Sequence, residues 1–312
     1  MRIIRQHSLG GPEVLELEDL PRPQPGPTEV LVRVAAAGVN PVDWKVRTYG
    51  AFLGEPPFTV GWDIAGVVEE GEGFEPGERV FGMPRFPGEA KAYAEYVTAP
   101  ADELARIPEG LSDVEAGALP LAGLTAWQAL ADTADVQPGQ RVLILAAAGG
   151  VGHLAVQIAK ARGAYVIGTA RFVKEAFLYE LGADEAVDYT SDAVETVVSD
   201  VDVVLDLVGG ESSAPTITCL RDGGLYIAVP SASALDRLNE LAANRVRVTG
   251  ILVHPDRTGL EGLSALIEAG QLKVTVEQTF PLEQAARAHE LGETGRTQGK
   301  LVLTVANHND LP

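Results

Sequence analysis

Residues 142–160 read VLILAAAGGVGHLAVQIAK, in which an apolar run, a glycine-containing turn and a helical pattern follow without a break. Ala146, Gly149 and Gly152 have the spacing A-x-x-G-x-x-G, where minimal side chains let backbone N–H groups approach a phosphate and let a helix pack closely on a strand. The N-terminus of the helix then faces the anion. The stretch predicts a turn that binds a dinucleotide pyrophosphate, although an ordinary strand-to-helix turn fits the same pattern. The predicted loop residues are Ala146, Gly149, Gly150, Val151 and Gly152.

Five more short apolar runs follow this turn, and helical patterns lie between them. The first helix ends at Gly163, and residues 174–181 before Gly182 repeat the arrangement. Strands that alternate with helices are typical of a parallel sheet. Together with the first run they predict a six-stranded Rossmann domain, the alternative being another doubly wound sheet with a small-ligand site. The five runs are residues 164–170, 186–190, 202–209, 224–230 and 246–253.

The N-terminal part of the chain has a different sequence pattern. Short apolar segments alternate with connections rich in proline and glycine, such as residues 21–27 and 71–77, which indicates an all-β region. Ser112 and Glu115 then form a capping box for a helix that leads toward the nucleotide-binding region. The predicted N-terminal strands are residues 29–37, 64–70, 78–82 and 93–98.

The C-terminal part returns to mixed structure after the sixth parallel strand. Residues 259–269 and 281–291 have helical patterns, and the apolar segment 300–305 reads as a strand. We expect this last strand to pair back with the N-terminal β region.

Length and charge narrow the class of protein. With 312 residues, 46% of them hydrophobic, the chain can bury a large core and is expected to form two domains. The formal charge of −20 argues against a nucleic-acid or anionic-membrane partner, because both need clustered basic residues. The single cysteine, Cys219, excludes an intrachain disulfide and a four-cysteine zinc site. Residues 1–8 lack the apolar core of a signal peptide, so a soluble cytoplasmic protein is predicted.

Six motifs lie along the chain in a characteristic order. They are AAGVNPVDWK at 36–45, GWDIAGVV at 61–68, GERVFG at 77–82, LPLAGLTAW at 119–127, the loop at 146–152 and GRTQGK at 295–300. Over nearly the whole chain they resemble the zinc-independent medium-chain dehydrogenase/reductases, and more narrowly the quinone oxidoreductases, zeta-crystallin-like proteins and enone reductases. The resemblance implies a GroES-like catalytic domain of residues 1–119 and 257–312. It also implies an inserted Rossmann NADP-binding domain of residues 120–256, and a homodimer.

The resemblance also implies that no catalytic zinc is present. Zinc alcohol dehydrogenases of the same superfamily have a cysteine at the position of Asn40 and a His-Glu pair after Gly61. Here Asn40, Trp62 and Asp63 hold these positions, and none is a good soft or imidazole ligand. Without a metal to polarise the acceptor, hydride transfer suits a quinone or an α,β-unsaturated carbonyl, because the charge that develops is delocalised.

Two candidate catalytic residues follow from the first motif. Asn40 is expected to donate a hydrogen bond to the developing oxyanion, with a simple turn before Pro41 as the alternative. Lys45 is expected to bind the cofactor or donate a proton, with a solvated charge beside Arg47 as the alternative. Four aromatic residues either line a flat apolar substrate pocket or pack in the core. They are Trp44, Tyr49, Phe52 and Trp62.

The end of the second parallel strand predicts NADPH rather than NADH. An NAD site usually has an acidic residue there, about 20 residues beyond the glycine loop, to bind the ribose hydroxyls. This chain has Arg171 and Lys174 instead, and either could make the main contact with a 2′-phosphate, unless both form a solvated helical turn. By resemblance, Thr125 contacts the nicotinamide side, Tyr189 lies near the adenosine and Arg296 returns from the C-terminal segment toward the cofactor.

Three functions remain open from the sequence. The first is an NADPH-dependent oxidoreductase that transfers hydride to a quinone or an α,β-unsaturated carbonyl. The second is an enoyl-thioester reductase of a biosynthetic pathway, and the third is a non-catalytic NADPH-binding sensor or scaffold protein. All three need the same glycine loop and a small-molecule ligand, and the two enzymes need an electrophilic substrate.

Overall fold

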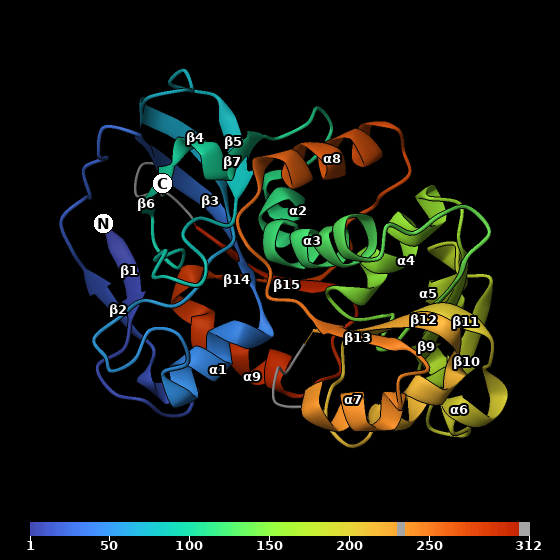
Figure 1. Ribbon diagram of the computed structural model, residues 1–312. Helices are drawn as coiled ribbons and strands as arrows, with labels where there is room; N and C mark the ends of the chain where they lie inside the picture. Colours follow the sequence, from blue (N-terminus) through green and yellow to red (C-terminus); the bar gives the residue numbers. More distant parts are fainter. Residues whose placement is uncertain (230–234, 306–312) are drawn as a thin grey trace. The chain divides into compact units, whose positions relative to one another are not determined.

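The computed structural model describes residues 1–229 and 235–305, and the chain divides into two compact units (Figure 1). Unit 1 consists of Met1–Leu124, His254–Glu268 and the chain from Val274 onward. Unit 2 consists of Thr125–Val253 and Ala269–Lys273.

Unit 2 contains a six-stranded parallel sheet in the order β10-β9-β8-β11-β12-β13. The chain starts at the centre of the sheet, moves outward to one edge, then crosses back and moves outward to the other edge, which is the Rossmann topology. This confirms the predicted fold class. The strands are β8 Arg141–Ile144, β9 Tyr165–Ala170, β10 Glu185–Asp188, β11 Val201–Asp206, β12 Leu220–Ala228 and β13 Arg247–Gly250. The predicted fifth strand extended to Pro230, which lies outside the described residues.

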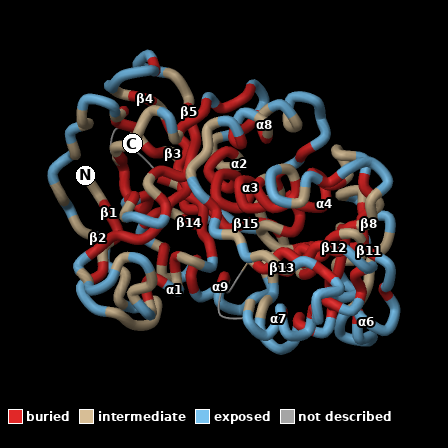
Figure 2. Tube along the Cα trace, viewed as in Figure 1, coloured by how far each residue is buried: buried red, intermediate tan, exposed pale blue. Residues whose placement is uncertain are grey.

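Helices between these strands bury the apolar faces of the sheet. Most of α3 and α4 is buried, as the red course of both helices shows in Figure 2. Ala147 and Leu178 both lie against Gly168 of β9, where a Cβ would come within 2.9 Å of the Ala147 side chain. Helix α3, Pro120–Trp127, precedes β8, and the helices between the strands are α4 Gly152–Ala161, α5 Glu175–Glu180, α6 Val194–Val197 and α7 Leu235–Ala242.

Unit 1 is built on a seven-stranded sheet in the order β14-β15-β3-β4-β5-β7, with β6 also paired to β3. Strand β15 runs antiparallel to β3, which confirms that the C-terminal strand pairs with the N-terminal region. A separate antiparallel pair, β1 with β2, completes the β structure of the described residues. The strands are β1 Arg2–Arg5, β2 Glu16–Asp19, β3 Glu29–Val39, β4 Ile64–Gly71, β5 Arg79–Gly82, β6 Tyr96–Pro100, β7 Leu104–Arg106, β14 Val276–Pro281 and β15 Lys300–Thr304.

Helices α2, α8 and α9 of unit 1 agree with the sequence patterns. Ser112 accepts the backbone N–H of Glu115, and the Glu115 carboxylate accepts the backbone N–H of Ser112, so the predicted capping box is present. Helix α9 is preceded by a 3₁₀ turn, Leu282–Gln284, which explains why it starts later than expected. The helices are α2 Asp113–Ala118, α8 Arg257–Glu268 and α9 Ala285–Glu293.

The all-β interpretation of the N-terminal region missed helix α1, Pro41–Tyr49. Its start has local signals: Asn40 has extended dihedrals, Pro41 stands at the first helical position, and the Asp43 carboxylate accepts the Asn40 backbone N–H at 2.7 Å. Gly50 ends the helix with a φ of 67°. The predicted strand 93–98 also begins later, at β6, because Tyr93 turns into a buried polar cluster instead.

The compact units differ from the predicted domain boundaries in three places, the smallest being residues 254–256, which lie in unit 1 rather than in the predicted Rossmann domain. Residues 120–124 lie in unit 1 rather than in the predicted Rossmann domain, and in unit 1 the Leu121 N–H donates to the Asp63 carboxylate at 2.7 Å. Ala269–Lys273 lies in unit 2, because the Gln157 side chain donates to the Lys273 carbonyl and accepts its N–H. At 120–124 and at 269–273, side chains bind backbone far away in the sequence. The end of the predicted segment 257–312, residues 306–312, lies outside the described residues.

The helices within residues 1–229 and 235–305 include none that combines the length and the apolar character needed to cross a bilayer.

Candidate active site

The glycine loop between β8 and α4 in unit 2 is a tight turn with little room for side chains. Ala146 has a φ of 51°, and its N–H donates to Thr169 Oγ1 at 3.1 Å. A Cβ on Gly152 would lie 2.4 Å from the Ala146 carbonyl oxygen and 2.7 Å from Ala147 Cα, so only glycine fits. The loop therefore brings bare backbone to the N-terminus of a ten-residue helix, α4. Gly149, Gly150 and Val151 lie in the same turn, and the arrangement suits a pyrophosphate.

The carboxyl ends of β9 and β10 carry the predicted cation and tyrosine. These parallel strands are neighbours, so the residues that follow them meet at one edge of the sheet. Arg171, directly after β9, is exposed, and its Nε donates to the Tyr189 hydroxyl at 3.2 Å. Lys174 ends the 3₁₀ turn that follows. Sequence reasoning missed Phe172 and Val173, whose apolar side chains are 70% and 82% exposed beside Arg171.

Asn40 lies at the centre of a buried polar cluster in unit 1. Its Nδ2 donates to Asp63 Oδ2 at 2.8 Å, and its Oδ1 accepts from the Lys300 ammonium. Because an ammonium group has only donors, Oδ1 must face Lys300 and Nδ2 must face Asp63. The amide is held in one orientation. Lys300 and Asp63 also form an ion pair, with 3.6 Å between Nζ and Oδ2.

Burial shifts the ionisation of this cluster. It raises the pKa of Asp63, and the neighbouring Lys300 and Asn40 oppose that shift. It lowers the pKa of Lys300, while Asp63 and Asp43 oppose that shift. Mutual attraction thus supports the charged forms of both partners. Sequence reasoning assigned no role to Lys300, although the residue ends the last of the six motifs.

The four aromatic candidates separate into different environments. Trp62 is fully buried, donates from Nε1 to the Gly88 carbonyl at 2.6 Å and packs edge-on against Phe86, which favours the core-packing alternative. Trp44 is partly buried. Tyr49 is 76% exposed and Phe52 is 55% exposed, so both are accessible in unit 1.

The remaining predicted contacts divide between exposed and buried positions. Lys45 on α1 and Arg296 in the segment after α9 are exposed. Thr125 on α3 is buried, with 3% of its surface accessible. Their cofactor roles stay predictions.

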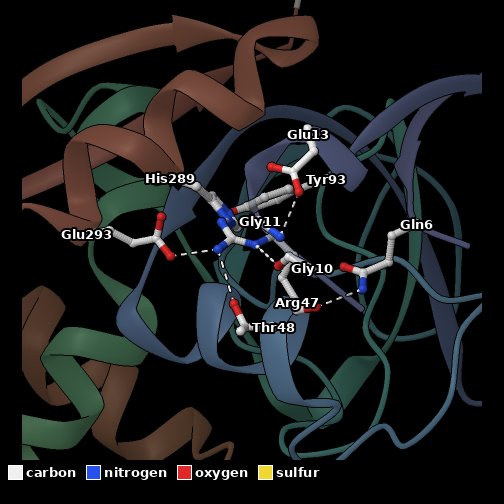
Figure 3. A network of polar contacts seen from close by, with 9 residues as sticks. All are labelled: Gln6, Gly10, Gly11, Glu13, Arg47, Thr48, Tyr93, His289 and Glu293. Carbon is white, nitrogen blue, oxygen red and sulfur yellow. Dashed lines mark hydrogen bonds and ion pairs between the residues drawn. The ribbon is translucent and has the colours of Figure 1, made fainter. Parts of the chain in front are cut away.

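A chain of polar side chains that sequence reasoning missed runs through unit 1, and Figure 3 draws four of its members, Glu293, Arg47, His289 and Tyr93. Arg47 donates to Glu293 at 2.6 Å, and its Nη1 lies 3.1 Å from His289 Nδ1. His289 Nε2 lies 3.1 Å from the Tyr93 hydroxyl, which donates to Asp43 Oδ2 at 2.9 Å. Arg47, His289, Tyr93 and Asp43 are all at most 1% exposed. The one feature of the sequence that could have indicated their burial is that these four polar residues have apolar neighbours in the sequence.

Asp63, at one of the positions that hold zinc ligands in zinc alcohol dehydrogenases, already accepts hydrogen bonds from other groups of the protein. Asp63 Oδ1 accepts the Leu121 N–H at 2.7 Å, and Oδ2 accepts from Asn40. Across the described part of the chain, no three His, Cys, Asp or Glu side chains are grouped in a way that could hold a metal ion.

Known proteins match this chain over almost its full length. Residues 26–109 match the alcohol dehydrogenase GroES-like domain family, and residues 181–303 match the family described as zinc-binding dehydrogenase. The structure of the quinone oxidoreductase from Coxiella burnetii is 38% identical, covers 98% of this chain and 99% of its own, and has a TM-score of 0.92. The chain belongs to the quinone oxidoreductase family.

Two further relatives of this family bear on the chemistry. The 2-haloacrylate reductase of a Burkholderia species is 35% identical over 95% of this chain and 97% of its own. The Escherichia coli quinone oxidoreductase, solved in complex with NADPH, is 30% identical, covers 97% of this chain and 100% of its own, and has a TM-score of 0.88. The resemblance inferred from the motifs is thereby confirmed, and so is the oxidoreductase class.

Proposed function

We propose that this chain is an NADPH-dependent oxidoreductase that transfers hydride to a quinone or an α,β-unsaturated carbonyl without zinc. The observation that carries the proposal is the side-chain-free cradle at Gly152, followed by a cation at the end of β9 where an NAD site has an acid. The relative solved with NADPH supports the same cofactor. The relatives named quinone oxidoreductase and 2-haloacrylate reductase support the two substrate classes.

Residues of unit 2 have the chemistry to hold NADPH. Backbone N–H groups of the loop and the N-terminus of α4 would bind the pyrophosphate. Arg171, with Lys174 nearby, would bind the 2′-phosphate, and the exposed rings of Phe172 and Tyr189 offer an apolar surface for the adenine. When bound, the nicotinamide supplies the hydride.

Residues of unit 1 would act on the substrate. The Asn40 amide carries two N–H groups and donates one to Asp63, so the proposal assigns the other to the oxygen that gains charge. Lys300 orients this amide and does not touch the substrate in the proposal. The zinc-free assignment is supported by Asp63, both of whose oxygens already accept hydrogen bonds, and by the buried indole of Trp62.

An NADPH-oxidation assay on a panel of quinones, short enones and enoyl thioesters tests this function. We expect turnover with a quinone or an enone, and we expect the rate to be the same with and without a metal chelator. Turnover with the thioesters alone would favour the biosynthetic reductase. NADPH binding without oxidation in the presence of any of the three classes would favour a non-catalytic sensor or scaffold.

Arg171→Ala is expected to raise the NADPH dissociation constant about tenfold or more and to leave the NADH dissociation constant nearly unchanged. A charge-assisted hydrogen bond contributes roughly 1.5–3 kcal/mol, and only NADPH has the 2′-phosphate that would receive it. Titration calorimetry with both cofactors measures the effect, and the same experiment on Lys174→Ala identifies the main contact.

Arg237→Ala on α7 is the matched control, because it removes an exposed arginine of unit 2 that pairs with Glu240 in its own helix. We expect this control to leave both affinities unchanged. Equal affinity of the unmodified protein for NADPH and NADH would contradict the assignment.

A further inference from the structure

The polar chain from the exposed Glu293 to the buried Asp43 has one direction of hydrogen-bond donation when Asp43 is ionised. A guanidinium group has no acceptor, so Arg47 donates and His289 Nδ1 accepts. Burial and the neighbouring Arg47 lower the pKa of His289 to about 3, so the imidazole is neutral and carries its hydrogen on Nε2. Nε2 then donates to the Tyr93 hydroxyl, and the hydroxyl donates to Asp43.

This chain of hydrogen bonds ends at Asp43, on the first turn of α1. Asp43 Oδ2 accepts both the Tyr93 hydroxyl and the backbone N–H of Asn40, at 2.9 Å and 2.7 Å. The same carboxylate therefore couples Tyr93 to the residue that the proposed function places at the substrate oxygen. Asp43 Oδ1 has no hydrogen-bond partner among the described residues, so these two donors are the contacts that hold the carboxylate.

At its other end, the chain of hydrogen bonds joins Arg47 on α1 to His289 and Glu293 on α9. The Trp44 ring lies edge-on to the His289 imidazole, with 6.1 Å between centroids. A Cβ on Gly292 would lie 2.6 Å from that ring, so α1 approaches α9 as closely as a glycine allows. Arg47 also donates to the Gly10 carbonyl at 3.1 Å, which Figure 3 shows beside its contact with Glu293. Three segments far apart in the sequence thus hold one nine-residue helix.

We propose that Tyr93, with His289 and Arg47 behind it, is a positioning residue that sets the first turn of α1 and thereby the amide of Asn40. The proposal rests on the proposed function for the role of Asn40, but not for the hydrogen-bond chain. The proposed role of Tyr93 involves no contact with a reacting atom. It acts through Asp43.

The ionisation of Asp43 makes the proposal testable by pH. Burial raises the pKa of Asp43 to about 7, and the hydrogen bonds from Asn40 and Tyr93 oppose the shift. Among charged neighbours, Asp63 raises the pKa further and Lys300 lowers it. The carboxylate that accepts both donors is therefore the main form above about pH 7, and activity should fall as the pH falls through this value. Without the Tyr93 hydroxyl the pKa rises, so the fall in activity moves to higher pH.

Tyr93→Phe is the first test, since it keeps the ring and removes one hydroxyl. We expect kcat to fall on the order of tenfold or more because the amide is misplaced, with little change in the NADPH dissociation constant. We also expect the acid limb of the kcat profile to move to higher pH. Tyr226→Phe is the matched control, because it removes a buried hydroxyl that donates to Asp206 at 3.0 Å in unit 2. A kcat and a pH profile equal to those of the control would overturn the proposal.

Asp43→Asn is the second test and does not depend on how well Tyr93→Phe folds. The amide is neutral at every pH and resembles the protonated carboxyl, so we expect the acid limb near pH 7 to disappear and kcat at pH 8 to fall to the value that the unmodified protein has on the acid side of its limb. Persistence of that limb in Asp43→Asn would contradict the proposal.

Hydrogen–deuterium exchange of peptides that cover the first turn of α1 separates this proposal from the proposed function. We expect faster exchange there in Tyr93→Phe than in Tyr226→Phe, whether or not the protein reduces any acceptor. A protein without activity but with this exchange difference would sink the proposed function and support the positioning of the turn. If the two variants exchange at the same rate in these peptides, the proposal that Tyr93 positions the first turn of α1 is wrong, even if the protein is an active reductase.

Discussion

Lys300→Met is expected to destabilise unit 1 by about 3–5 kcal/mol. The substitution removes the ammonium that donates to Asn40 and to the Val39 carbonyl, and it leaves the Asp63 carboxylate buried without its cation. Removal of one partner from a buried ion pair costs far more than the pair contributes, because the remaining charge stays out of water. Denaturant unfolding followed by tryptophan fluorescence measures the loss, since Trp44 and Trp62 both lie in unit 1.

Lys160→Met is the matched control for this prediction. Lys160 pairs with Asp184 at 2.7 Å, but the two side chains are 32% and 29% exposed, so we expect a loss below about 1 kcal/mol. Asp63→Asn added to Lys300→Met should recover part of the lost stability, because no uncompensated charge is then buried. Equal losses in the two lysine variants would refute the account of the buried pair.

Asn40→Ala is expected to lower kcat on the order of 100-fold while the NADPH dissociation constant stays nearly unchanged. The loss of one oxyanion donor typically costs about 3 kcal/mol of transition-state stabilisation. The residue lies in unit 1, whereas the proposed pyrophosphate and 2′-phosphate contacts lie in unit 2. Steady-state kinetics with saturating NADPH, well below the unfolding temperature, measure the effect.

Gln157→Ala controls for the structural cost of the Asn40 substitution. Gln157 is also a buried amide whose two ends are both hydrogen-bonded, to His153 and Lys273. It should lose stability without a comparable loss of kcat. If Asn40→Ala retains full activity, the residue only completes the start of α1, as the alternative interpretation holds.

The parts of the fold that the sequence predicted are those with local, repeating signals. The six parallel strands of unit 2 follow from apolar runs alternating with helical patterns, and the glycine loop follows from residue spacing alone. Helix α1 was missed because it lies among strands, although Asn40, Pro41 and Asp43 mark its start. The pocket assignment of Trp62 was equally uncertain from sequence, since an indole suits both a pocket and a core.

The sequence by itself determined the fold class, the family and the glycine loop, because each follows from motifs whose own residues stand close together in the chain. The tertiary structure alone decided which polar residues share the interior of unit 1. Lys300 meets Asn40 across 260 positions, and His289 meets Arg47 across 242. The sequence does not distinguish a buried lysine or histidine from an exposed one, and no periodic pattern in the sequence predicts which residue will be its partner. Only the pairing of β15 with β3 and the packing of α9 against α1 bring these side chains together, where burial then sets their charges.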